Sequence, residues 1–116
     1  MSREEHTRHA VHALLRQQQL GVLSTGGEDG PYASLVAFAV SDDDRRLFFV
    51  TPRATRKFAN LTANARVALL VNNSINHPED FHQAAAVTAT GSAQSVSAMQ
   101  LEAIRNHYLA KHPYLE

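Results

Sequence analysis

Residues 47–61, LFFVTPRATRKFANL, carry the signal from which the fold can be worked out. The apolar run Leu47–Val50 is typical of a strand, and it leads directly into hydroxyls and a proline. Thr51 is expected to cap a short helix with Pro52 at its first position, which leaves the N–H groups of the first turn free for an anion. Three cations follow: Arg53, Arg56 and Lys57. Together these features predict a phosphate-binding site.

Residues 51–57, the part of this segment that carries the hydroxyls and cations, are called the anion cradle below. Its helix is expected to bury Ala54, Phe58 and Leu61, which recur at helical spacing. An arginine fork beside free N–H groups can hold two phosphate oxygens at once. The other interpretation is a basic helix start that faces only solvent.

The composition limits the partners of this protein. At 116 residues the chain suits one domain, and its 11 basic residues balance its 11 acidic ones. A neutral chain gives no reason to expect nucleic acid or a membrane surface, so a small-molecule partner is expected. Without cysteine there is neither a disulfide nor a thiolate nucleophile. The charged N-terminus has no apolar signal segment, and a cytoplasmic location is expected.

An amphipathic helix is predicted at the start of the chain. Residues 3–18 lack glycine and proline and place their apolar side chains on one side. His6, His9 and His12 recur within this helix, but no carboxylate is obviously placed as a third ligand. No metal site is therefore expected.

A hairpin of two strands follows the helix. Residues 20–25 and 32–40 flank a turn rich in glycine. Both faces of the second strand are mainly apolar, which predicts burial on both sides, by the domain core and by a subunit interface or flat ligand. The acidic run Asp42–Asp44 is expected to be a solvated turn, because carboxylates at consecutive turn positions point apart.

Downstream of the cradle, the chain alternates between apolar and polar segments. Residues 66–71 predict a central, fully buried strand, residues 72–82 a loop, and residues 83–95 a strand of small residues. Ser97 and Gln100 form a capping box that opens a helix over residues 97–112. Its buried side is expected to contain Leu101, Ile104 and Tyr108.

The order of these elements resembles the FMN-binding split β-barrel family, typified by pyridoxamine 5′-phosphate oxidase. The matching sequences are Gly21–Thr25, Asp29–Val36, Phe49–Thr51 with Thr55–Lys57, and Asn64–Val71. The resemblance implies a mainly β (α+β) fold over residues 1–116. An antiparallel split β-barrel of six strands or slightly fewer would occupy residues 20–95, between helices 3–18 and 97–112.

The resemblance also implies a set of cofactor contacts. In that family the backbone of the second strand lies along the flavin ring, which corresponds here to Ser34, Leu35, Val36 and Ala37. The phosphate side corresponds to Val50, Thr51, Thr55, Arg56 and Lys57. A similar loop near the ribityl chain and phosphate corresponds to Asn73 and Ser74.

The function implied is that of a flavin-dependent oxidoreductase acting on a small molecule. FMN would be the cofactor, bound at the subunit interface of a homodimer, with hydride passing through flavin N5. No side chain is compelled as an acid or base, and His82 is the best candidate for a proton donor. Oxidation of pyridoxamine phosphate itself is not expected, because residues 105–108 do not match the family's Arg and Tyr grouping.

Two alternatives belong to other functional classes. The first is a binding module for haem, a deazaflavin or a sensory flavin, with His107 and His112 as candidate axial ligands. The second is a cofactor-free dimerisation domain. Members of the family usually continue with a further strand beyond the point where this chain ends, so either a minimal variant or an incomplete sequence is expected.

Overall fold

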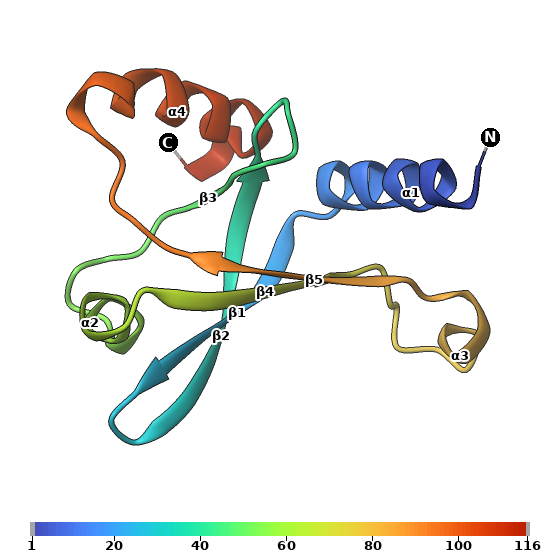
Figure 1. The fold of residues 1–116 in the computed structure, drawn as a ribbon, viewed down its shortest axis with the longest axis horizontal. Coiled ribbons are helices and arrows are strands. Elements are labelled where there is room, and N and C mark those ends of the chain that lie inside the picture. Colours follow the sequence, from blue (N-terminus) through green and yellow to red (C-terminus); the bar gives the residue numbers. More distant parts are fainter. Residues whose placement is uncertain (1, 116) are drawn as a thin grey trace.

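The computed structural model describes residues 2–115. Its helices are α1 (Arg3–Gln17), α2 (Arg56–Ala63), α3 (Asp80–Gln83) and α4 (Ala98–Lys111), followed by a 3-10 turn, Pro113–Leu115. Its strands are β1 (Leu20–Gly27), β2 (Gly30–Val40), β3 (Leu47–Phe49), β4 (Arg66–Asn72) and β5 (Ala86–Ser92). Figure 1 shows α2 and α3 at opposite ends of the sheet and α1 projecting from it. No helix in this range is long and apolar enough to cross a membrane.

The five strands form one antiparallel sheet in the order β3-β2-β1-β4-β5. β1 and β2 are paired from Leu20↔Ala37 to Gly27↔Gly30, and Gly30 has φ +104°, a conformation that favours glycine in a tight turn. β1 also pairs with β4, which makes it the centre of the sheet. The mainly β fold with flanking helices is therefore confirmed, with five strands.

One face of the sheet carries the core. Alternate residues of β1, β2 and β4 point to this face, and α1 packs against it. The residues of this core that are at most 5% exposed are Leu14, Leu15, Leu23, Val36, Phe38, Val40, Leu69 and Val71. Burying each of these side chains stabilises the fold by roughly 1.5–3 kcal/mol relative to exposure.

The opposite face of the sheet is open in a single protomer. Leu35 of β2 is 64% exposed and Leu70 of β4 is 38% exposed. Within one chain, the prediction that residues 32–40 are buried on both sides is met only at residues 38–40, and the rest of the stretch is covered on one face at most. The prediction of a fully buried strand at residues 66–71 is wrong for the same reason, because β4 alternates between buried and exposed positions.

Side chains of α4 and of its C-cap residue, His112, bond to the C-terminal end of β2. Tyr108 donates to the carbonyl of Ala37 (3.3 Å), His112 to that of Phe38 (2.7 Å) and His107 to that of Val40 (2.6 Å). The carbonyls can only accept, so each histidine presents an Nε2–H. These bonds satisfy backbone groups that would otherwise lack partners.

The sequence prediction for α4 is wrong in two details. Ser97 occupies the cap position, but its side chain makes no capping hydrogen bond. Leu101, expected on the buried side, is 54% exposed, whereas Tyr108 is buried. The helix meets the sheet mainly through its C-terminal half, so its first turn packs on little.

The turn between β2 and β3 is tied to α1. Asp44 accepts from His12 Nδ1 (2.7 Å) and from Arg16 Nη1 (2.6 Å), and these hydrogen bonds lower the pKa of its carboxyl group. Asp43 accepts from the Ser41 hydroxyl and from the N–H of Arg45. The acidic run is an exposed turn, as its pattern predicts, but its anchoring to α1 through Asp44 is not predicted by the pattern.

Candidate functional site

The start of α2 lies later in the chain than the sequence pattern predicts. Thr55, not Thr51, is the N-cap: its hydroxyl accepts from the N–H of Phe58 (3.1 Å), and the helix begins at Arg56. Residues 51–54 form a turn in which Ala54 is exposed instead of buried. Pro52 contributes differently, because its carbonyl accepts from the N–H and the hydroxyl of Thr55 (3.2 and 2.8 Å).

Because the helix begins at Arg56, the first-turn N–H groups belong to the residues that were themselves predicted to bind the phosphate. The N–H groups of Arg56 and Lys57 lie in the first turn, where the helix supplies no acceptor. The hydroxyls of Thr51 and Thr55 lie 3.0 Å apart beside them. Backbone donors, hydroxyls and two cationic side chains therefore meet at one helix N-terminus, which is the chemistry that binds phosphate.

The edge of β2 next to the cradle is unpaired. β3 pairs with β2 only over Phe38↔Phe49 to Val40↔Leu47, so within the described residues the stretch 30–37 has no strand on that side. Val50 would face Ala37 if the pairing continued, but the chain turns away toward α2. Along residues 34–37 this edge therefore has no strand partner, although the carbonyl of Ala37 accepts from Tyr108. The contacts of this edge with a flavin ring stay a prediction.

Two contacts place the cradle beside the end of this edge that is nearest to the β1–β2 turn. The guanidinium of Arg56 lies 5.3 Å from the ring centroid of Tyr32 in β2. Its Nη2 also donates to Asp29 Oδ2 (3.0 Å) in the β1–β2 turn, where both side chains are largely exposed. These contacts place the start of α2 beside Tyr32, whereas Val50 follows β3 near the Phe38↔Phe49 pair at the opposite end of the same edge.

A buried polar contact, which the sequence analysis missed, fixes α2 on the sheet. Asn60 is 8% exposed, and its Nδ2 donates to Thr25 Oγ1 (3.0 Å). A Cβ at Gly27 would lie 2.5 Å from Asn60 Oδ1. The available signal was the glycine pair Gly26–Gly27 in β1, which leaves room for a close neighbour; Asn60 itself lies off the side predicted from Ala54, Phe58 and Leu61.

Asn73 and Ser74 are not brought to the cradle of the same protomer. They follow β4 at the end next to α3, whereas α2 precedes β4 at its other end (Figure 1). Asn73 pairs with Ala85 through both its N–H and its Oδ1, and Ser74 bonds to Asn72. These contacts stabilise the start of the loop.

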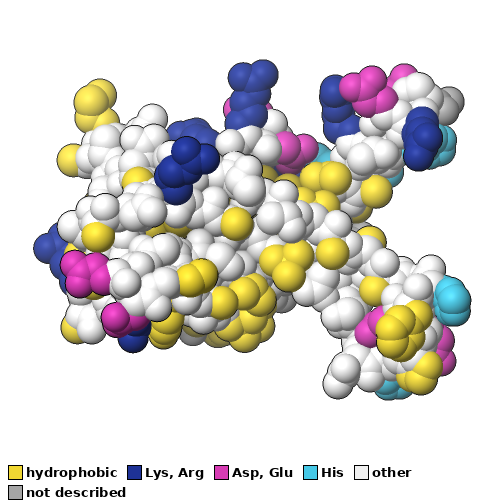
Figure 2. All heavy atoms as spheres, turned by 60° about the horizontal axis from the view of Figure 1, so that its bottom comes forward, with side chains coloured by type: hydrophobic (Ala, Val, Ile, Leu, Met, Phe, Trp, Pro, Cys, Tyr) yellow, Lys and Arg dark blue, Asp and Glu magenta, His cyan; other side chains and the backbone are white. Residues whose placement is uncertain are grey.

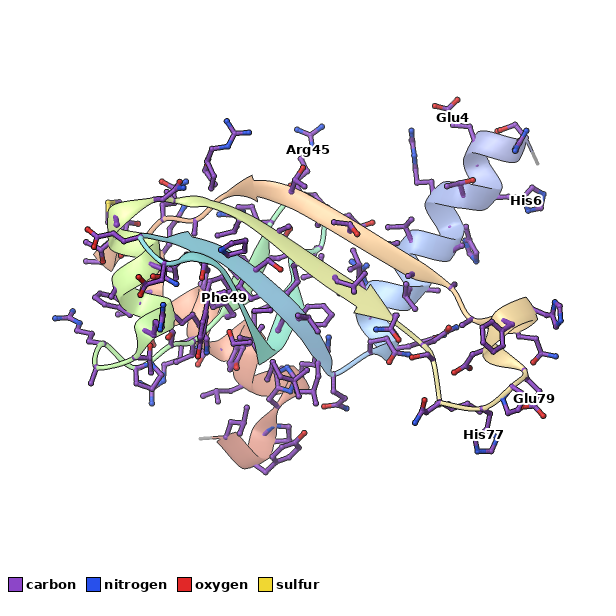
Figure 3. The ribbon with its side chains drawn as sticks, turned by 90° about the horizontal axis from the view of Figure 1, so that it is seen from below. Glu4, His6, Arg45, Phe49, His77 and Glu79 are labelled. Carbon is purple, nitrogen blue, oxygen red and sulfur yellow. The ribbon has the colours of Figure 1, made fainter. Side chains whose placement is uncertain are left out.

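The histidines singled out in the sequence occupy separate places. His82 is exposed on α3, and His6 lies on the outer part of α1, as Figure 3 shows for the His6 label. Among residues 2–115 no three His, Asp or Glu side chains are placed to hold a metal ion. His107 and His112 use their Nε2 atoms on β2, and His112 is 1% exposed. Either would have to give up its bond to β2 to bind iron through that atom.

A shallow groove of about 760 Å³ crosses β1, β4 and β5 beside the β1–β2 turn. Its lining consists mostly of small residues, including Ser24, Gly26, Ala68 and Thr90, with Arg66 at the margin. These named residues point to the face of the sheet that is open in one protomer. The groove is therefore part of that open face and not of the cradle.

The fold and the cradle together define a class of protein. A five-stranded antiparallel sheet curled as half a barrel between helices, with a basic helix start beside its second strand, is a split β-barrel. A family model described as pyridoxamine 5′-phosphate oxidase matches residues 7–115. The chain belongs to this family, and the resemblance inferred from the sequence is confirmed. The comparison with curated proteins gave no match.

Solved structures show the same fold at low sequence identity. A protein of unknown function from Agrobacterium tumefaciens has a TM-score of 0.81 at 19% identity, over 99% of this chain and 48% of its own. An FAD-binding protein from Mesorhizobium loti has 0.69 at 22%, over 97% and 77%. A heme-binding protein from Mycobacterium smegmatis has 0.73 at 20%, over 84% and 40%. The chain thus spans less than two thirds of two of these proteins.

Proposed function

We propose that this protein binds FMN between two protomers and acts as a flavin-dependent oxidoreductase on a small molecule. The observation that carries the proposal is the meeting of the unpaired edge of β2 with the N-terminus of α2. The stack of Arg56 on Tyr32 marks one end of this arrangement, and the pair Phe38↔Phe49 marks the other. A flat ring with an anionic tail matches an edge of backbone donors and acceptors that ends in a cradle.

The cradle fits a phosphate group. Arg56 and Lys57 would supply cationic donors, and the first turn of α2 would supply backbone N–H groups. The hydroxyls of Thr51 and Thr55 lie beside them, and that of Thr55 would have to exchange its bond to the Pro52 carbonyl for one to the phosphate. Asp29 would compete for one edge of the Arg56 guanidinium, but its contact uses Nη2 alone. The remaining donors of the fork stay available to a ligand.

The exposed area of the protomer supports association. A compact protein of 12.8 kDa exposes about 6,300 Å², whereas this chain exposes 8648 Å². The difference, about 2,300 Å², is in the range that one partner buries in a large obligate dimer. The radius of gyration, 15.2 Å, likewise exceeds the roughly 13 Å of a compact chain of similar length.

The open face of the sheet is the surface we assign to the dimer. The register places Leu35, Val22 and Leu70 side by side across β2, β1 and β4 on this face. Leu20 extends the apolar row and is 48% exposed. Figure 2 shows, in addition, α1 and α3 as two arms that project on the same side of the body. A partner held by this face and these arms would bring its own Asn73 and Ser74 toward the cradle.

The chain's residues would bind and orient the cofactor and exclude water from it. When bound, FMN supplies hydride transfer through N5 of its ring. The backbone of residues 34–37 would hold the polar edge of the ring, and the cradle would fix the phosphate. We assign no side chain as a catalytic acid or base, since His82 is exposed on α3, away from the cradle.

The test is the visible spectrum of the protein as purified, and after incubation with FMN and removal of unbound ligand. The proposal requires flavin absorption bands and a stoichiometry near one FMN per protomer. A Soret band would favour the haem alternative, and no visible band in either sample would favour a cofactor-free dimerisation domain. A reductant screen then tests whether the bound flavin turns over.

A further inference from the structure

Lys111, near the end of α4, is held between α1 and β2. Its Nζ donates to the carbonyl of Leu15 (3.1 Å) and lies 4.1 Å from the centroid of the Phe38 ring. The side chain is partly buried, and it lies away from the anion cradle. The fold therefore keeps a lysine amine in one position, against an apolar ring.

Lys111 is one of the residues that line a cavity of about 280 Å³ between α1, β2 and α4. Its apolar lining comes from Ala39, Val40 and Ala110. The volume falls just below the roughly 300–1,000 Å³ of pockets that hold drug-sized ligands. The cavity therefore suits a molecule of only a few heavy atoms.

The polar side chains around the cavity are Arg16 from α1, Asp42 from the β2–β3 turn and His107 from α4. Arg16 is already engaged, since it donates to Asp44 Oδ1 (2.6 Å) and to the carbonyl of Ser41 (3.3 Å). It is therefore a poor receptor for an added anion. Burial and, secondly, the Arg16 charge lower the pKa of Lys111 to about 8. A substantial fraction of the amine is then neutral near physiological pH.

We propose that Lys111 is a modification site that forms an imine with small apolar aldehydes in this cavity. The amine nitrogen adds to the carbonyl carbon to give a carbinolamine, which then loses water. The oxygen of that water comes from the aldehyde and both of its protons come from the amine, so no oxidant or reductant is needed. The neutral imine relieves the partial burial of a cation, and its formation releases the Leu15 carbonyl and the Phe38 ring from their contacts with the amine. The apolar walls favour an uncharged aldehyde.

The chain offers a clean test because it contains only two lysines, Lys57 and Lys111. Purified protein is treated near neutral pH with propanal and cyanoborohydride, with N-acetyl-lysine amide in the same tube as a reference amine. Peptide mass mapping then gives the rate at each site. We expect Lys111 to react roughly tenfold or more faster than the reference amine, which has an ordinary pKa. Its rate should level off as the pH passes about 8.

A matched pair of variants tests the cavity itself. Both alanines are exposed on α4, but only Ala110 lines the cavity, so Ala110→Leu fills part of it and Ala103→Leu adds the same side chain outside it. Both changes suit a helix. Ala110→Leu should slow alkylation of Lys111 several-fold, while Ala103→Leu should not. Equal rates in the two variants, or a wild-type Lys111 no faster than the reference amine, would overturn the proposal.

Discussion

The guanidinium of Arg56 lies over the ring of Tyr32, 5.3 Å from its centroid, although 24 residues separate them in the chain. This contact joins the start of α2 to the unpaired edge of β2. It turns two features that are each common, a basic helix start and a strand edge, into one candidate site. The predictions below test the site, its support and the surface that we assign to the dimer.

Leu35 tests the dimer surface. Leu35→Asp places a carboxylate on the open face, where a partner would cover it without a counter-charge. The dissociation constant of the dimer should rise by at least tenfold, about 1.4 kcal/mol or more. Sedimentation velocity over a dilution series measures this constant. Leu101→Asp, on the exposed start of α4, is the control and should leave association unchanged. If both variants sediment as the wild type does, the open face is not the interface.

A substitution at Gly27 tests the contact between Asn60 and Thr25 that holds α2 on the sheet. A Cβ in Gly27→Ala would lie 2.5 Å from Asn60 Oδ1, and Asn60 cannot move away without losing its bond to Thr25. Urea unfolding should show a loss of roughly 1–3 kcal/mol. Gly91→Ala is the matched control, because nothing lies within 4 Å of a Cβ there. Unfolding midpoints that shift equally in the two variants would contradict the contact.

Lys111 makes the stability depend on pH in a defined direction. Its pKa is about 8 in the folded protein against 10.5 for an ordinary lysine, so between these values the unfolded chain binds more protons. The free energy of unfolding should therefore rise with pH across this window. Tyr108, whose pKa burial raises, opposes the rise only above about 10. Lys111→Met should remove the rise in denaturant titrations, and an unchanged slope in this variant would assign the effect to other groups.

The sequence predicts the fold well because its strongest signals are local and mutually consistent. The hairpin around Gly30, the acidic turn and the helix at the chain start each follow from turn chemistry or periodicity. The sequence analysis placed the helix cap at Thr51 instead of Thr55, and this error has a physical reason, since both threonines are suitable caps. The choice between them is decided by the Pro52 carbonyl, which bonds Thr55.

The features that the sequence does not predict depend on long-range contacts. Asn60 and Thr25 meet across 35 residues, and Lys111 meets Leu15 across 96. The apolar pattern of residues 32–40 predicts two covered faces but not which of them stays open in one protomer, because Leu35 fits a core and a partner surface equally well. The placement of Asn73 and Ser74 far from the cradle likewise follows only from the length and direction of β4.

The most direct test of the central claim is a titration of wild type and Arg56→Ala with FMN and with riboflavin, which lacks the phosphate. If Arg56 binds the phosphate, the variant should lose roughly 1.5–3 kcal/mol of FMN affinity and almost none of its riboflavin affinity. Arg56→Lys should recover part of the loss, because it restores the charge without the fork. Flavin fluorescence quenching gives all the constants. Equal losses for the two flavins would contradict the assignment of the cradle to the phosphate of FMN.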